Sequence, residues 1–428
     1  MAQQLSLLPE TFSPLKNDNR SGTFTANMKL PIHRWFRYSA GFSAEWVKNV
    51  IQEYSPACVL DPFAGSGTTL LASAQCNIDA YGFESHPFVA KIANAKLAWG
   101  HSIDEINDLA QEIANKATNK KISICGEPDL LLKCYDSKSL TELCALRDAF
   151  IETKETATPR AANIIWLAIT SILRSCSFVG TAQWQYILPK KMKAKVLQPI
   201  NAFNCKIQEI TADMLDFQIN NYSKNTFILT HDARLDCKKL ENKIDLVITS
   251  PPYPNNYDYA DATRLEMCFW GEIKKWGDLQ HTVRKHIIRS CSQHATADKI
   301  NIEEILNEQF LSPIRDDLTT ICRSLEKIRH QHGGKKAYHL MVAGYFSDLA
   351  KIFHVLRKCC RHSATMCFVI GDSAPYSVYV PVDNLLGKLA LSAGFSNFSF
   401  EKIRDRNIKW KNRKHTVPLQ EGRLWIRG

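Results

Sequence analysis

The fold is decided by the stretch Cys58-Val59-Leu60-Asp61-Pro62-Phe63-Ala64-Gly65-Ser66-Gly67-Thr68-Thr69. Its first three residues predict a short buried strand that ends at Asp61-Pro62, and a glycine-rich turn leads from there into a helical run over 70–74. A second strand is expected over 80–83, closing on Glu84. Strand, glycine turn, helix, strand and acid in this order predict a right-handed parallel βαβ unit, with the turn and the acid at the carboxyl edge of the sheet.

The same alternation of strands and helices frames the rest of the chain. Upstream, apolar residues at helical spacing predict a helix over 43–53 with Ser43 as its N-cap. Downstream, apolar runs predict strands over 226–229, 244–248, 365–370, 398–403 and 423–426, and helices over 345–356 and 382–393. The expected fold is a doubly wound, mostly parallel α/β sheet with helical insertions.

Two segments interrupt this alternation of strands and helices, and the N-terminal residues precede it. Residues 1–30 are polar and predict a partly ordered arm. The α/β domain is expected to be discontinuous, over 31–99 and 221–428, with a mostly helical insertion at 100–220 that includes a lysine-rich segment after Pro189. A second helical excursion is expected at 260–335.

Composition narrows the class of protein. The 428 residues are 45% hydrophobic, and 54 basic against 43 acidic residues give a net charge of +11. This is typical of a globular, cytoplasmic protein, because the sequence shows neither an apolar run long enough to span a bilayer nor a secretory signal. The 14 cysteines lack the spacing of a zinc site or a disulfide framework, so we expect reduced thiols and no metal. Basic residues gather at 190–195 and 401–428, which indicates a phosphate-binding footprint.

Three carboxylates follow three predicted strands at one edge of the sheet: Asp61, Glu84 and Asp232. The turn between them spells neither the six-residue dinucleotide fingerprint nor the phosphate loop. A ring of acids would repel a pyrophosphate but would attract a ligand with an amino group, a sulfonium and a ribose diol. We therefore expect S-adenosylmethionine, with Glu84 on the ribose hydroxyls and Asp61 near the amino-acid end.

A second polar centre is Thr249-Ser250-Pro251-Pro252-Tyr253. Two prolines end the strand and hold the preceding residue extended, which predicts a rigid lip. The Ser250 hydroxyl and a proline-flanking carbonyl can accept hydrogen bonds from one exocyclic amino group, and Tyr253 offers a ring on which a base can stack. The lone pair of such an amino group is delocalised into the ring. Drawing the amino protons out of the ring plane returns part of it to the nitrogen, which makes the nitrogen a better nucleophile.

Together the 61–69 and 249–253 motifs resemble the amino-methyltransferases of DNA, which methylate cytosine N4 or adenine N6. The likeness covers about half the chain, in blocks across 33–98, 226–270 and 340–428. The resemblance makes the α/β domain the catalytic domain and adds Tyr38 and Phe42 from the segment that closes over the methionine end. The implied cofactor-binding residues are Tyr38, Phe42, Asp61, Pro62, Phe63, Gly65, Gly67, Thr68, Glu84 and Asp232, and the implied catalytic residues are Ser250, Pro251, Pro252 and Tyr253.

The resemblance implies that a base is flipped out of duplex DNA, stacks on Tyr253 and attacks the methyl group in line, without a covalent enzyme intermediate. Carbon-5 methylation needs a cysteine nucleophile, normally in a Pro-Cys pair, and the sequence contains no such pair. Ser250 at the first position of the lip favours cytosine N4 over adenine N6.

Several alternatives stay open at this point. The chain also fits an RNA base amino-methyltransferase or a catalytically silent DNA-binding subunit. The residues that read the target are expected in 100–220 or in 260–335. Expected partners are duplex DNA and a cognate restriction endonuclease as a functional partner, with a nucleoid-associated location and no membrane.

Overall fold

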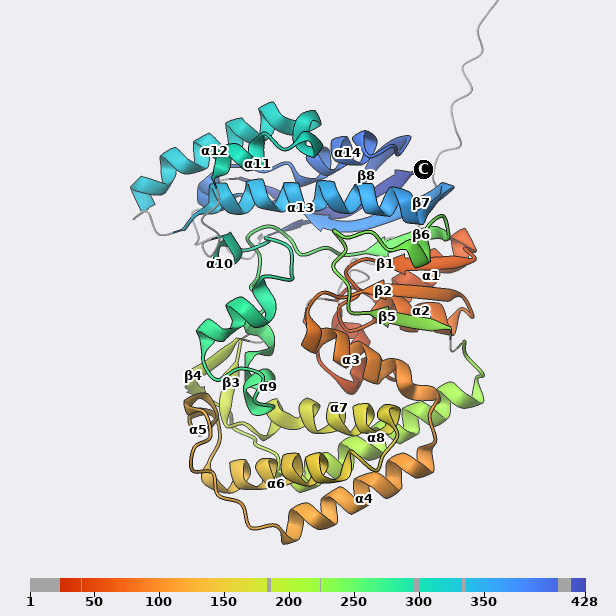
Figure 1. Cartoon of the computed structure of the whole chain (residues 1–428), viewed down its shortest axis with the longest axis vertical. Coiled ribbons are helices and arrows are strands. Elements are labelled where there is room, and N and C mark those ends of the chain that lie inside the picture. Colours follow the sequence, from red (N-terminus) through yellow and green to blue (C-terminus); the bar gives the residue numbers. More distant parts are fainter. Residues whose placement is uncertain are drawn as a thin grey trace, which may run out of the picture.

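A seven-stranded sheet in the order β5-β2-β1-β6-β7-β9-β8 lies in the upper right of the molecule as seen in Figure 1. The computed structural model describes residues 24–39, 41–182, 186–223, 225–295, 301–332, 336–406 and 417–428. The strands are β1 (Cys58–Asp61), β2 (Asp79–Phe83), β5 (Thr226–Leu229), β6 (Ile244–Thr249), β7 (Cys360–Gly371), β8 (Asn397–Arg406) and β9 (Leu419–Arg427). Strands β5, β2, β1, β6 and β7 pair in parallel, and β9 runs antiparallel to β7 and β8. The predicted doubly wound, mostly parallel sheet is confirmed.

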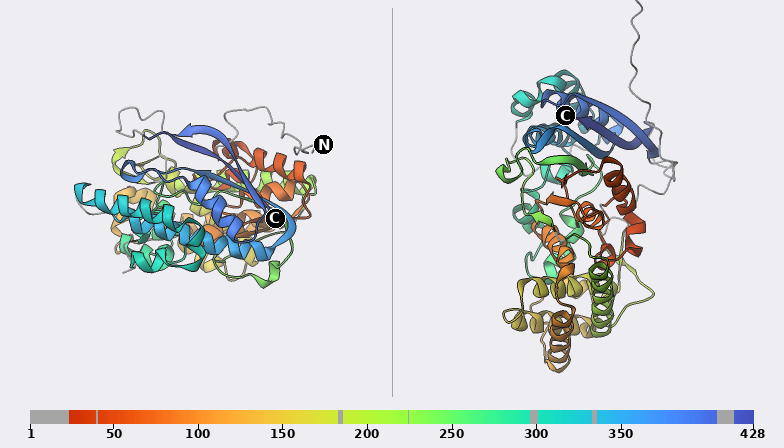
Figure 2. Two further views of the ribbon diagram at one scale, coloured as in Figure 1. Left: turned by 90° about the horizontal axis from the view of Figure 1, so that it is seen from above. Right: turned by 90° about the vertical axis from the view of Figure 1, so that its right-hand side faces the viewer.

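Helices cover both faces of this sheet (Figure 2). Side chains alternate along a strand, so neighbouring residues of β1 enter different cores. Val59 packs with α1 (Ala44–Tyr54) and α2 (Thr68–Gln75), whereas Leu60 packs with α13 (Tyr338–Cys359) and α14 (Val382–Ser392). Burying each such side chain stabilises the fold by roughly 1.5–3 kcal/mol. Ser43 caps α1 as predicted, since its hydroxyl accepts a hydrogen bond from the Trp46 N–H at 3.3 Å.

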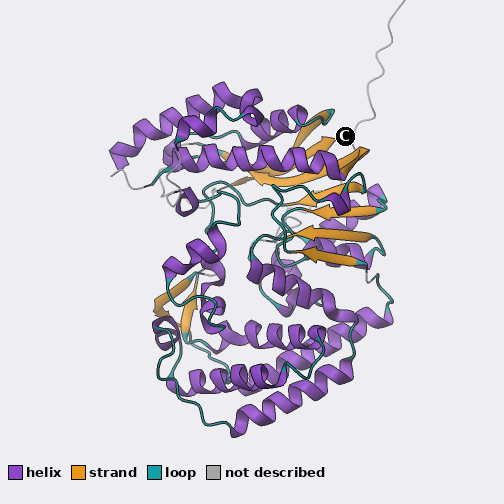
Figure 3. Cartoon of the chain, viewed as in Figure 1, coloured by secondary structure: helices purple, strands orange, loops and turns teal. Residues whose placement is uncertain are grey.

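The 100–220 insertion is built mainly from helices, which continue from α3 (Pro87–Leu97) into one apolar core. They are α4 (Ile103–Asn119), α5 (Asp129–Cys134), α6 (Ser137–Thr153), α7 (Pro159–Cys176) and α8 (Pro199–Ile219). The sequence did not indicate the two-stranded sheet that interrupts them, β3 (Val179–Thr181) with β4 (Ile187–Met192) (Figure 3). The lysine-rich segment after Pro189 is therefore partly a strand, and its expected helical pattern was wrong.

The 260–335 excursion consists of short helices and one longer one. It contains α9 (Arg264–Phe269), α10 (Ser292–Ala295), α11 (Ile302–Leu306) and α12 (Arg315–Arg329), the last packed on α13. The predicted arm falls outside the described residues up to residue 23, and its end, Phe24–Lys29, forms a 3-10 helix. All 14 cysteines are free thiols. None of the helices in the described ranges is long and apolar enough to cross a membrane.

Strand order reverses between β1 and β6, and this reversal positions the site. From β1 the chain adds β2 and β5 on one side, and β6 and β7 lie on the other side. In open α/β sheets such a switch point opens a crevice outside the carboxyl ends of the strands, where ligands bind. Here the two ends carry the glycine turn after Asp61 and the proline lip after Thr249.

Candidate active site

One buried carboxylate joins the glycine turn to the proline lip. Asp61 has no exposed surface, and its oxygens accept hydrogen bonds from the Thr249 hydroxyl at 2.6 Å, the Thr69 hydroxyl at 2.6 Å and the Phe63 N–H at 3.0 Å. Burial raises the pKa of Asp61 to about 6, although these three bonds oppose the rise. Asp61 thus connects the two motifs through its side chain, and both of its oxygens accept hydrogen bonds from protein donors.

The glycine turn brings backbone close to the space above β1 and β2. Gly65 and Gly67 both have positive φ, 53° and 87°, a conformation that favours glycine. A Cβ at Gly65 would lie 3.1 Å from Tyr38 Cε1, so the half-buried Tyr38 ring covers the turn. Thr68 begins α2, whose first N–H groups face the same end of the sheet. Pro62 and Phe63 complete the turn.

Glu84 closes the turn from the next strand. Its carboxylate accepts from the Gly65 N–H at 2.9 Å and the His86 N–H at 2.8 Å. Burial raises the pKa of Glu84 to about 7, against the effect of these two backbone donors. Because this pKa lies above the ordinary value of 4.5, the ionised form destabilises the fold. This contribution to the free energy of unfolding therefore falls as the pH rises from 4.5 to about 7.

The two aromatic residues predicted upstream have different environments. Tyr38 lies on Gly65, whereas Phe42 is 6% exposed and packs edge-on against Trp46 in the core beneath α1. The Phe42 ring is therefore part of the apolar core. The backbone before Tyr38 is held by Lys96 of α3, which is 2% exposed and donates to the His33 carbonyl at 3.0 Å. Burial lowers the pKa of Lys96 to about 7.

Asp232 lies at the carboxyl end of the β5 segment, but an internal partner holds it. Arg234 donates to both of its oxygens, at 2.9 Å from Nε and 2.7 Å from Nη2, and also forms an ion pair with buried Asp348 at 3.1 Å. Asp348 in turn pairs with Arg289 at 2.7 Å. This network could not be predicted from the sequence beyond an arginine two residues after Asp232, because Asp348 and Arg289 approach it from distant segments.

The proline lip is oriented by its neighbours on β7 and β8. The Ser250 hydroxyl donates to the Val369 carbonyl at 3.3 Å and also contacts the Tyr253 phenol, so a lone pair remains as an acceptor. A Cβ at Gly371 would lie 3.1 Å from the Tyr253 ring, and the Arg406 guanidinium lies over that ring at 5.1 Å. Burial raises the pKa of the Tyr253 phenol far above its ordinary value, which keeps the phenol neutral.

An aromatic wall continues from the lip and reaches the insertion. Tyr257 and Tyr259 lie edge-to-face at 4.5 Å, and Tyr257 lies 5.7 Å from Tyr186. The Tyr186 hydroxyl accepts a hydrogen bond from the Asp258 N–H at 2.8 Å. Sequence reasoning missed this wall, although the spacing of three tyrosines after the prolines was a visible signal.

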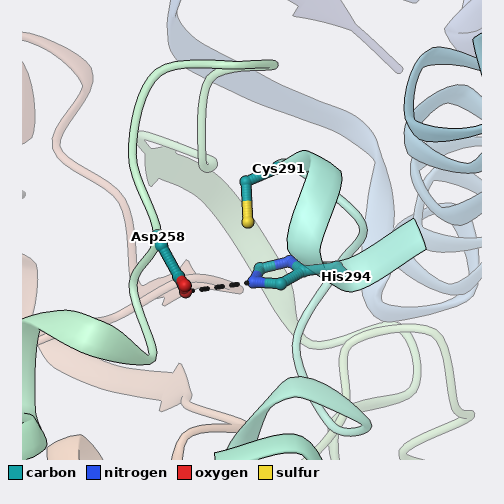
Figure 4. A group of neighbouring side chains, drawn as sticks. All are labelled: Asp258, Cys291 and His294. Atoms are coloured by element: carbon teal, nitrogen blue, oxygen red, sulfur yellow. Dashed lines mark hydrogen bonds and ion pairs between the residues drawn. The ribbon is translucent and has the colours of Figure 1, made fainter. Parts of the chain in front are cut away.

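Asp258, which lies between two of these tyrosines in the sequence, belongs to a buried polar cluster (Figure 4). Asp258, Cys291 and His294 bring potential metal-ligating atoms within 4.8 Å of one another. Asp258 is paired with Arg284 at 2.7 Å and contacts His294 at 3.4 Å. Burial would raise the pKa of Asp258, but His294 and Arg284 lower it to about 2. Burial also raises the pKa of the Cys291 thiol well above its ordinary value, which disfavours the thiolate. A guanidinium on the carboxylate and a protonated thiol are a poor donor set for a metal ion, so this cluster is better described as structural.

The sequence of this chain is similar to those of known methyltransferases. A family model described as DNA methylase, of the N6/N4 type, matches residues 11–95. The type II methyltransferase M.BsoBI of Geobacillus stearothermophilus is 25% identical over 434 residues, covering 90% of this chain and 82% of the relative. M.AvaI of Nostoc sp. is 26% identical, covering 87% of this chain and 81% of the relative, and M.MvaI of Kocuria varians is 21% identical, covering 92% and 90%.

These relatives align over most of both chains, and the matched model contains the glycine turn and Glu84. These matches support the DNA amino-methyltransferase family for this chain, and with it methyltransferase activity.

Proposed function

We propose that the protein transfers a methyl group from S-adenosylmethionine to the exocyclic N4 of a cytosine flipped out of duplex DNA. The observation that carries this proposal is the 2.6 Å hydrogen bond from Thr249 to Asp61. It holds the glycine turn and the proline lip at one switch point, where a cofactor on the first and a base on the second would share one space.

The residues around the turn fit S-adenosylmethionine. Glu84 would accept the ribose hydroxyls, since its two backbone donors leave further lone pairs on a carboxylate. Tyr38, the backbone of Gly65 and Gly67, and the side chain of Thr68 would surround the methionine end. The bound cofactor supplies an electrophilic methyl group on a sulfonium. We propose that Asp61 acts on it indirectly, by fixing Pro62 and Phe63, and that Phe42 acts by packing.

Asp232 would face the adenine end of the cofactor. Its ion pair with Arg234 already occupies part of its hydrogen-bonding capacity. We propose that the Asp232–Arg234 pair as a whole forms the adenine side of the cofactor site, with one remaining lone pair of Asp232 as the hydrogen-bond acceptor for the cofactor.

The lip would act on the target amino group. Ser250 and the carbonyl next to Pro251 would accept its two protons, while Pro252 keeps the lip rigid. Tyr253 would carry the base on the face opposite Arg406. The attacking nitrogen would form its bond to the methyl carbon as the carbon–sulfur bond breaks, and the excess proton would leave to solvent. Ser250 as the first lip residue supports cytosine N4, with adenine N6 as the alternative.

The acidity of Glu84 predicts a pH dependence of cofactor binding. Only the ionised carboxylate accepts from both ribose hydroxyls, and its pKa is about 7. We expect the affinity for S-adenosylmethionine to rise by up to about tenfold per pH unit below this value and to level off above it. Calorimetric titration from pH 5.5 to 8.5 measures this, and a Glu84→Gln variant should bind weakly with a flat profile. An equally steep profile in that variant would assign the titration to another group.

The lip chemistry predicts the effect of removing one hydroxyl. Ser250→Ala should lower methyl transfer roughly 10- to 150-fold, since one acceptor for a polarised amino group is worth about 1.5–3 kcal/mol. Labelled methyl transfer to duplex DNA and to RNA measures the effect, and sequencing the modified bases identifies the target. Ser324→Ala is the matched control, because that hydroxyl donates to a helix carbonyl at 2.8 Å far from the lip.

Each outcome of that experiment decides between the open alternatives. N4-methylcytosine in DNA supports the proposal, and N6-methyladenine would replace the base assignment. Transfer to RNA alone would favour the RNA reading, and transfer to neither polymer would favour a silent DNA-binding subunit.

We also propose duplex DNA as the physical partner and a restriction endonuclease of the same specificity as the functional partner. The type II designation of the relatives and the net charge of +11 support this. A cytoplasmic, nucleoid-associated location follows as part of the same proposal.

A further inference from the structure

The β3–β4 hairpin stands apart from the main sheet (Figure 3). It is antiparallel, with Gly180 opposite Leu188 and Thr181 opposite Ile187. The strands approach closely, since a Cβ at Gly180 would lie 2.9 Å from the Lys191 carbonyl. A two-stranded ribbon of this kind is narrow enough to enter the major groove of duplex DNA, which is about 12 Å wide.

The hairpin is fixed to the rim of the active site. Tyr186, the residue just before β4, accepts the hydrogen bond from the Asp258 N–H at 2.8 Å, and Asp258 lies five residues after Tyr253. At the other end, the Lys193 ammonium donates to the Arg174 carbonyl, and Arg174 forms an ion pair with Glu266 of α9 at 2.5 Å. The ribbon is therefore held at a set position relative to the lip.

Its free surface is basic. Lys190 and Lys191 of β4 are exposed, as is Lys195 shortly after the strand, and Met192 is 65% exposed. Within the described ranges no carboxylate forms an ion pair with any of these three lysines. The other basic segment is different: in its described part, Arg404 pairs with Glu421 and Arg423 pairs with Glu401. Its residues 407–416 lie outside the described residues.

We propose that the β3–β4 hairpin is the DNA-docking element of this enzyme and that Lys190 and Lys191 contact phosphates of the duplex beside the flipped base. The proposal rests on the proposed function, because it assigns a docking element to that DNA. Charge complementarity selects a polyanion, the ribbon shape selects a groove, and the Tyr186 contact places that groove next to Tyr253. Anchoring here sets which base reaches the lip.

The test compares two double variants that remove equal charge. Lys190→Gln with Lys191→Gln alters the hairpin, and Lys121→Gln with Lys327→Gln removes exposed lysines after α4 and on α12. Binding of a labelled duplex is measured by fluorescence anisotropy between 50 and 300 mM salt, since losing two phosphate contacts lowers the log–log slope by about 1.8. The hairpin variant should show this smaller slope, at least about tenfold weaker binding at low salt and a raised KM for DNA, and the control should match the wild type.

Cofactor affinity and thermal unfolding midpoint are measured alongside and should be unchanged in both variants. If the hairpin variant keeps the wild-type slope and KM, or if the control falls equally, the docking proposal is overturned while the proposed function stands. If the wild-type protein itself neither binds nor methylates duplex DNA, the proposed function fails first. Preferred binding of duplex RNA by the wild type would overturn both.

Discussion

Asp61→Ala should lower the free energy of unfolding by about 3 kcal/mol and abolish most methyl transfer. The change leaves the Thr249 and Thr69 hydroxyls and the Phe63 N–H without their buried acceptor, and each orphaned buried group costs about 1 kcal/mol or more. The glycine turn and the lip would then move independently. Urea denaturation and labelled methyl transfer measure the two effects.

Two further variants separate stability from catalysis. Asp61→Asn keeps one oxygen and an amide in place and removes a carboxylate whose raised pKa of about 6 shows that its charge is unfavourable there. It should therefore unfold near the wild-type midpoint. Asp245→Ala is the matched control, because Asp245 also joins β6 to the β1 segment, through the Cys58 N–H at 2.9 Å, but at the opposite edge of the sheet. It should lose stability and keep methyl transfer once folded. An Asp61→Ala protein with wild-type stability and rate would contradict this connecting role of Asp61.

Tyr253→Ala should lower kcat/KM for duplex DNA roughly 5- to 150-fold, the equivalent of the 1–3 kcal/mol that base stacking on an aromatic ring provides. Tyr253→Phe keeps the ring and should keep most of the activity. The affinity for S-adenosylmethionine should not change in either variant, since the ring belongs to the proline lip, where Arg406 and Gly371 are its neighbours.

A mismatched duplex sharpens this experiment. A mismatched target base costs less to flip, so it should recover part of the activity that Tyr253→Ala loses. If Tyr253→Phe is as impaired as Tyr253→Ala, the hydroxyl rather than the ring is the active group. Equal rates for Tyr253→Ala and the wild type would contradict the proposal that the base stacks on Tyr253.

The central sheet and both motifs could be predicted because their signals are local. A buried run ending at Asp61, a turn with two glycines and a strand stopped by two prolines each fix the backbone within a few residues. Parallel strands carry their carboxyl ends to one edge of the sheet, and the hydrogen bond that joins Asp61 to Thr249 there is a finding of the structure.

What the sequence did not show depends on long-range contacts. Arg234 captures Asp232 only because Asp348 and Arg289 complete the network, and Arg406 reaches Tyr253 from a distant strand. Phe42 lies in the core because Trp46 covers it. The β4 strand has a lysine-rich sequence with weak strand propensity, and its pairing with β3 overrides that local preference.

A crystal structure of the protein with a non-reactive cofactor analogue and duplex DNA would test the central claim most directly. The distance to measure joins the atom in place of the transferable methyl group to the exocyclic nitrogen of the flipped base. We expect the two atoms about 3–3.5 Å apart, with Glu84 on the ribose and Tyr253 under the base. An analogue and a base bound in separate cavities would contradict the account.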